Sequence, residues 1–401
     1  MDNNNNQDNL KKSNNDEEFT NINMKKVYDN MNNNTSNTFS IFNSKNINFN
    51  HEEKMKITKF LSSEYLQQRN IGLKAQGLEN GDFSYLNALI QCLGGVPDIL
   101  LYLQNNISYI NNPQKLPLTF SFFQIIERLY HNSKNSKVYN SKRFLEIIEH
   151  CFPFLKTEKN PIDLYHLLFH DMHDEINEKK NQKNYQNKVD KKNMNEVINY
   201  ELNLFNNNNK SIFSELFTLF YKKEIQCTSC NGNFYELQNF ISLDLDVINI
   251  YKKYQKNNLT IKECLKEFMN PISTKRVCHI CNTVSQLMVR RTIFSTSNIL
   301  VFIVNRFNRE EEEEMKKIKF EFEDNLDMTN YIENNSQNIK IHYILIGVVT
   351  FLFKENKFAA FCKNLLSYKW TCFVDENVYE CNYEQIINES TPYLLFYKKF
   401  E

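Results

Sequence analysis

Two Cys-x-x-Cys pairs constrain this chain more than any other feature. One pair is Cys227 and Cys230, the other is Cys278 and Cys281, and 47 residues separate the two pairs. Each pair presents two thiolates from one tight turn, so two pairs complete a tetrahedral zinc site. Four cysteine ligands leave no open coordination position, which predicts a structural Zn2+ that folds a finger. The alternative interpretation is four unrelated buried cysteines.

Charge and apolar pattern restrict the partners and the compartment. The chain has 48 basic and 48 acidic residues and a net charge of zero, whereas nucleic-acid binding through bulk charge needs a basic excess. No apolar run reaches the ~20 residues of a membrane span, and the start, MDNNNNQDNLKK, lacks the apolar segment of a signal peptide. Ten cysteines without such a signal indicate reduced thiols or metal ligands. We expect an intracellular protein, nuclear or cytoplasmic, with no direct nucleic-acid partner and no membrane partner.

Composition divides the chain into ordered and low-complexity parts. The first fifty residues contain 18 Asn and few large aliphatics, so residues 1–55 are predicted to be a disordered Asn-rich tail. A similar composition recurs at 176–210, and an acidic run follows at 309–317. Both are predicted to be solvated loop insertions.

Between these inserts, helical patterns come first and strand patterns later. Apolar residues recur at helical spacing in several stretches before residue 176, and short β-rich runs dominate from about residue 211 onward. Helices followed by strands indicate an α+β protein, because alternating βαβ units would interleave the two patterns.

Five of the seven glycines fall within residues 72–95, and glycine is used where backbone turns tightly or another group approaches closely. Residues 77–93 of this window read GLENGDFSYLNALIQCL. The stretch resembles the cysteine box of the ubiquitin-specific proteases, written for that family as GLxNxGNTCYMNxxLQxL.

Later stretches resemble further family motifs in the same order. Residues 160–173 match its QDAxEFLxxLLxxLH helix, LVFIVNRF its LxIHLKRF strand, KFAAFCK its GHYxAYxK strand and WTCFVDENV its WYxFDDxxV strand.

The resemblance covers about residues 73–401 and implies the fold. It implies the papain-like fold of the ubiquitin-specific proteases within an α+β domain that spans residues 70–401. The expected parts are a helical thumb (70–175), a low-complexity insertion (176–210), fingers that carry the zinc ribbon (211–300) and an antiparallel-sheet palm (301–401).

The catalytic positions that the resemblance implies are all substituted. Active members use Cys as nucleophile, His as base, and Asp or Asn to hold the imidazole. Alignment places Ser84, Lys357 and Val374 at these three positions, with Asp375 directly after the third. The expected oxyanion-hole donor, Asn80, lies four residues before Ser84 instead of five. No intact triad remains at these positions.

We therefore interpret the chain as a pseudoenzyme that binds ubiquitin or a ubiquitinated protein. Its box resembles those of inactive family members in RNA-processing assemblies, which implies such a complex as a partner. The alternative is an active ubiquitin C-terminal hydrolase that uses Ser84 and Lys357, since Ser–Lys pairs occur on other folds. A third interpretation is a scaffold for an RNA-processing assembly that does not bind ubiquitin. A base within ~3 Å of Ser84 would favour the hydrolase.

Residues implied to bind the ubiquitin tail are also altered. The family's helix offers an Asp and a Glu to the basic tail of ubiquitin. Asp163 keeps the first carboxylate, whereas His166 stands at the Glu position. Loss of that charge is expected to weaken tail binding by about 1–3 kcal/mol.

Overall fold

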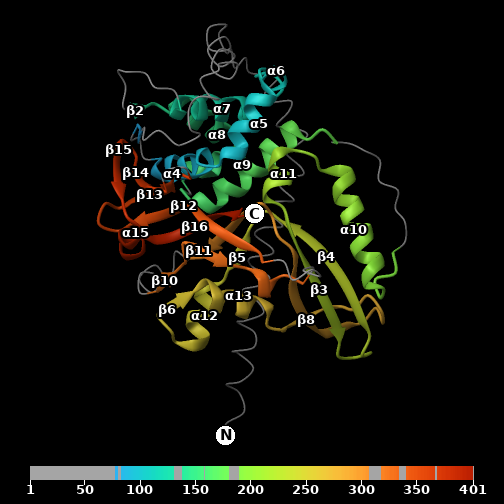
Figure 1. Ribbon diagram of the computed structural model, residues 1–401. Helices are drawn as coiled ribbons and strands as arrows, with labels where there is room; N and C mark the ends of the chain where they lie inside the picture. Colours follow the sequence, from blue (N-terminus) through green and yellow to red (C-terminus); the bar gives the residue numbers. More distant parts are fainter. Residues whose placement is uncertain are drawn as a thin grey trace.

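The computed structural model describes residues 77–79, 83–130, 138–157, 159–179, 189–306, 318–333, 340–365 and 368–400. The predicted tail (1–55) and the acidic run (309–317) lie outside the described residues. Within the described part, helices come first and strands later, which confirms the predicted α+β class (Figure 1). No helix in this part is long and apolar enough to cross a membrane.

A layer of helices, the thumb, lies above the central sheet (Figure 1). Its buried side chains form the thumb core, a cluster that includes Leu86, Phe122 and Leu168. Each buried Phe or Leu contributes roughly 1.5–3 kcal/mol, so this layer is strongly attached to the sheet. The thumb helices are α4 (Ser84–Gly94), α5 (Pro97–Asn105), α6 (Ile107–Ile110), α7 (Pro117–Tyr130), α8 (Lys142–Cys151), the 3-10 helix Pro153–Lys156, α9 (Pro161–Ile176) and α11 (Ile212–Phe217). Strands β1 (Gly77–Leu78) and β2 (Val138–Tyr139) pair beside them.

The palm is a mostly antiparallel sheet with strand order β15-β14-β13-β12-β16-β9-β5, and β11 also pairs with β12. All six residues of β9 are buried because alternate side chains enter the thumb core and a second cluster on the other face, the palm core. The strands are β5 (Leu243–Leu245), β9 (Ile299–Val304), β11 (Asn325–Asp327), β12 (His342–Leu352), β13 (Lys357–Lys363), β14 (Trp370–Val374), β15 (Asn377–Cys381) and β16 (Thr391–Phe400). The remaining elements are α12 (Val247–Tyr254), β6 (Asn258–Thr260), α13 (Ile261–Met269), β10 (Lys319–Glu321), the 3-10 helix Thr329–Tyr331 and α15 (Tyr383–Glu389).

The fingers are a separate four-stranded antiparallel sheet with strand order β4-β3-β8-β7. The strands are β3 (Leu219–Cys227), β4 (Asn233–Phe240), β7 (Ile272–Val277) and β8 (Val284–Ser295). The outer part of this sheet has its own small cluster, the finger core, made of Ile225, Cys227, Phe234, Cys278, Leu287 and Val289. The stretch predicted as fingers, 211–300, also supplies α11 to the thumb and β5 to the palm.

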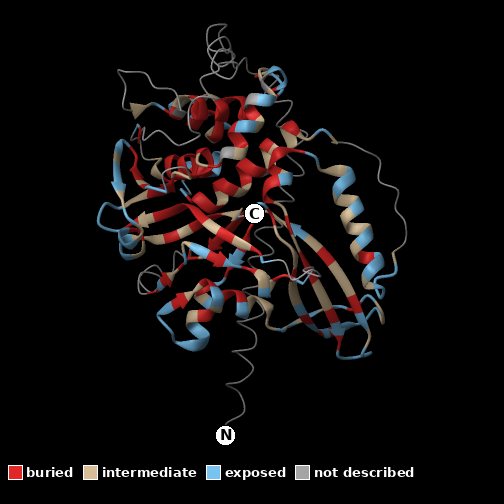
Figure 2. Ribbon diagram, in the orientation of Figure 1, coloured by how far each residue is buried: buried red, intermediate tan, exposed pale blue. Residues whose placement is uncertain are grey.

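The predicted loop insertion at 176–210 contains a regular helix, α10 (Met194–Asn208), so the loop interpretation is wrong for those residues. The side chain of Asn193 caps its N-terminus by accepting from the amides of Asn195 and Glu196. Val197 is buried, and the ring of Phe205 meets that of Phe220 on β3 at 5.1 Å. Figure 2 shows the rest of α10 as exposed or of intermediate burial, which explains why its composition is that of a loop.

Candidate functional site

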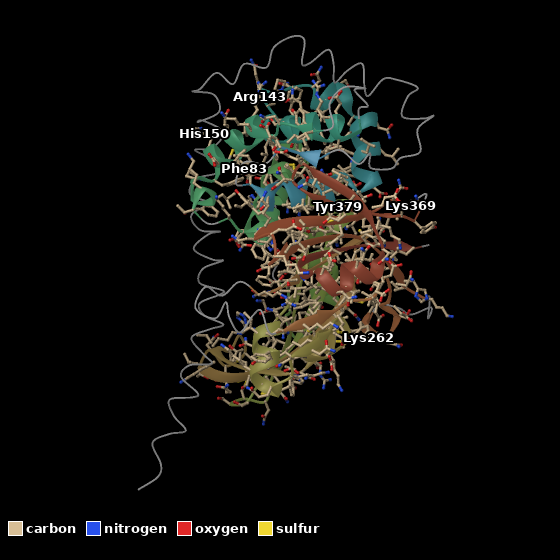
Figure 3. All side chains as sticks on the ribbon, turned by 90° about the vertical axis from the view of Figure 1, so that its left-hand side faces the viewer. Phe83, Arg143, His150, Lys262, Lys369 and Tyr379 are labelled. Carbon is tan, nitrogen blue, oxygen red and sulfur yellow. The ribbon has the colours of Figure 1, made fainter. Side chains whose placement is uncertain are left out.

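The predicted nucleophile position, Ser84, is the first residue of α4 and is half-buried. The backbone amide of Phe358 on β13 donates to Ser84 Oγ at 3.1 Å. The start of α4 therefore lies against the start of β13, as the resemblance implies. Among the described residues, no Lys, His, Asp or Glu side chain hydrogen-bonds to Ser84 Oγ. In the described part of the chain, Ser84 Oγ thus has no hydrogen-bonded base of the kind that would favour a hydrolase. Phe83, the residue before Ser84, is labelled in Figure 3.

Lys357, at the base position, is the first residue of β13. The turn before it ends at Asn356, whose φ of 52° is one that Asn tolerates better than most residues with a side chain. The Lys357 Nζ donates to Asp375 Oδ2 at 3.0 Å, and the Asp375 side chain is only 2% exposed. An ammonium group has no lone pair, so Lys357 in this ion pair cannot take a proton from Ser84.

The carboxylate beside Lys357 comes from Asp375, the residue directly after Val374. Val374 ends β14 with its side chain buried in the palm core. Asp375 follows in the turn that joins β14 to β15 and has a φ of 51°. The side chain at the predicted acid position is therefore apolar and buried, and the neighbouring residue carries the carboxylate that meets Lys357.

A hydrogen-bond chain holds the Asp375 carboxylate from behind. Asn87 Nδ2 donates to Asp375 Oδ1 at 2.8 Å, and Ser141 Oγ donates to Asn87 Oδ1 at 3.2 Å. We call Ser141, Asn87, Asp375 and Lys357 the Asp375 network. It joins the thumb to the palm at the place where the family has its base and acid. Sequence reasoning missed Ser141 because it lies in no motif, whereas Asn87 is part of the glycine-rich box.

The predicted tail-binding residues lie on α9, and Asn80 lies outside the described residues. Asn160 caps α9 and also donates from Nδ2 to Asp163 Oδ2 at 2.9 Å. Burial lowers the pKa of His166 to about 4, so its imidazole is neutral at pH 7. This end of α9 therefore carries one carboxylate, from Asp163, and one neutral imidazole ring, from His166.

The four predicted zinc ligands come together at the tip of the fingers. Their Sγ atoms all lie within 4.8 Å of one another. Cys227 Sγ lies 4.0 Å from Cys281 Sγ, and Cys230 Sγ lies 3.9 Å from Cys278 Sγ. A Zn–S bond of about 2.3 Å in a tetrahedron requires S–S distances of roughly 3.8 Å. The four thiols therefore lie close to the arrangement that a tetrahedral zinc ion requires.

The two Cys-x-x-Cys turns have the same backbone form. Asn231 and Asn282, each directly after the second cysteine of its pair, have φ of 54° and 55°. The Cys227 amide donates to Gly232 O at 3.0 Å, and the Cys278 amide donates to Thr283 O at 2.9 Å. The Cys230 amide, which points at Cys227 Sγ, lowers the pKa of that thiol to about 6. Amides directed at sulfur favour the thiolate form that binds zinc.

Comparison with known proteins gives a consistent result. The family model "Ubiquitin carboxyl-terminal hydrolase" matches residues 72–397. Ubiquitin carboxyl-terminal hydrolase 4 of Saccharomyces cerevisiae is 23% identical over 258 residues, which cover 58% of this chain. The matched part spans only 27% of that relative's length.

Solved structures show the same fold. A yeast SAGA DUB module superimposes with a TM-score of 0.59 at 21% identity, covering 83% of this chain and 70% of the other. The SAGA DUB module Ubp8/Sgf11/Sus1/Sgf73 bound to monoubiquitin gives 0.59 at 20% identity, with 83% and 71% covered. These neighbours confirm the predicted ubiquitin-specific-protease fold of thumb, palm and fingers. The chain belongs to the ubiquitin carboxyl-terminal hydrolase family, with a domain of the ubiquitin-specific-protease type.

Proposed function

We propose that this protein is a catalytically inactive member of its family and works by binding ubiquitin or a ubiquitinated protein. The observation that carries the proposal is the ion pair between Lys357 and Asp375. A serine hydroxyl is a weak nucleophile and needs an adjacent base. At the base position this chain has an ammonium group held by a buried carboxylate, so Ser84 is left without one.

The rest of the domain supports a binding role. The thumb, the palm and the fingers are present, and four thiols are arranged for a structural zinc in the fingers. One solved neighbour is bound to monoubiquitin within an assembly of several subunits. We propose that this protein likewise acts within a protein complex, inside the nucleus or cytoplasm, and an RNA-processing assembly is the partner that its substituted box favours.

The first test is turnover of a fluorogenic ubiquitin C-terminal amide by the full chain. We expect no turnover from the wild type, because its Ser84 hydroxyl has no adjacent base, and none from Ser84→Ala, which lacks the hydroxyl. Zinc analysis on the same samples checks that the fingers are folded. Turnover by the wild type that Ser84→Ala abolishes would establish a serine hydrolase and overturn the proposal.

Ubiquitin binding is measured separately by titration calorimetry on the same preparation. Saturable binding without turnover is the expected result. Absence of both would leave a protein-binding domain that does not recognise ubiquitin.

A further inference from the structure

One face of the finger sheet carries basic side chains next to the finger core. Lys223 on β3 and Arg291 on β8 are register partners, and each lies two residues from a member of the finger core, Ile225 and Val289. Side chains two residues apart in a strand share a face, so both cations lie on the face that carries this core. Directly opposed residues have Cβ atoms about 5 Å apart, where like charges repel each other. A bound anion would relieve this repulsion.

The acidic group on this face is already shared by other basic side chains. Register places Glu236 of β4 opposite Lys223, and Arg276 of β7 also lies on this face. Arg276 Nη2 donates to Glu236 Oε1 at 3.5 Å, and His279 Nε2 lies 4.0 Å from the same oxygen. The four finger strands thus place three basic residues and one acidic residue on this face.

The guanidinium of Arg291 lies over an aromatic ring. Its Cζ is 4.5 Å from the centre of the Phe268 ring on α13, and Lys223 Nζ is 5.6 Å from the centre of the Tyr221 ring. Among the described residues, Arg291 forms no hydrogen bond or ion pair, and its Nε is buried without an acceptor. An aromatic face attracts the positive charge but accepts few of the five N–H groups. Arg291 is only half-buried, so its terminal nitrogen atoms remain accessible to a ligand.

We infer that Lys223 and Arg291 bind a carboxylate from an acidic segment of a partner protein. A planar guanidinium forms paired charge-assisted hydrogen bonds with a carboxylate, and Lys223 adds a second positive charge from the neighbouring strand. A nucleic acid is disfavoured as the ligand, because its affinity depends on many phosphate contacts and Glu236 would repel its backbone. Such a partner is additional to ubiquitin, so the site can be tested without ubiquitin.

The test measures binding of a fluorescent polyglutamate peptide to the full chain by anisotropy at low ionic strength, where salt screens charges least. Arg291→Met is expected to raise Kd about tenfold, because charge-assisted hydrogen bonds are lost. The matched control is Arg290→Met. Arg290 is the preceding residue on β8, is exposed, and points to the opposite face of the sheet. Its loss should therefore change Kd by less than about twofold.

Thermal unfolding and zinc content verify that each variant is folded, and a polyglutamine peptide is the uncharged control. A wild type that does not bind polyglutamate, or equal losses in the two variants, would overturn the inference. Tighter binding of a single-stranded RNA than of the peptide would also overturn it. Binding that appears only after the glutamates at 310–314 are replaced by Gln would show that this chain's own acidic run occupies the site, which would overturn the inference of a partner.

Discussion

A Cys278→Ser variant is expected to purify without bound zinc and with unfolded fingertips. The finger core is small, it is separate from the other two cores, and two of its members are Cys227 and Cys278. Such a cluster buries too little apolar surface to be stable alone. Structural zinc contributes about 10–16 kcal/mol to the folding of isolated zinc-finger peptides. Loss of the zinc should therefore cost more free energy of folding than burial of the finger core contributes.

Metal analysis and hydrogen exchange measure the two consequences separately. We expect the zinc content to fall from about one ion per chain to none, and the amides of β3, β4, β7 and β8 near the cysteines to lose protection. Protection in the thumb and palm should remain, since their cores do not include the zinc ligands. The control is Cys151→Ser on α8, a thumb cysteine outside the cluster, which should keep its zinc. A Cys278→Ser protein with full zinc and protected fingers would show that these thiols are not its ligands.

The larger parts of the fold could be predicted from sequence because they have periodic or ligand-specific signals. The run ILVFIV at 299–304 indicates a strand buried on both faces, and the structure places it between two cores. The paired Cys-x-x-Cys turns likewise predicted a cluster that the structure brings within 4.8 Å. Helix α10 could not be found in this way, because only Val197 is buried and its exposed Asn residues are those of a loop.

The candidate site was predictable in position but not in chemistry. Motif spacing correctly placed Ser84 and Lys357 near each other, as the contact from the Phe358 amide to Ser84 Oγ shows. Spacing alone could not decide between Val374 and Asp375, because a hairpin turn with positive φ sets which side chain faces Lys357.

Asp375→Asn is expected to lower the free energy of unfolding by about 3 kcal/mol. Asn has the size of Asp and tolerates the positive φ at this position, so the change removes mainly the charge. The ion pair of Lys357 then loses its buried carboxylate. Breaking a buried ion pair costs about 3–5 kcal/mol. The lower end applies because the Lys357 side chain is 34% exposed and can turn to solvent. Urea denaturation measures the loss.

Two further variants test whether the loss of stability comes from the broken ion pair. Lys369→Met removes an exposed pair with Glu380 on the same sheet, where the side chains are 63% and 71% exposed, and should change the free energy of unfolding by at most about 1 kcal/mol. Figure 3 shows Lys369 and Phe83 on different sides of the molecule. Combining Lys357→Met with Asp375→Asn should restore part of the loss, since no unpaired charge then remains. Equal stability of Asp375→Asn and the wild type would show that the Asp375 network does not hold the thumb to the palm.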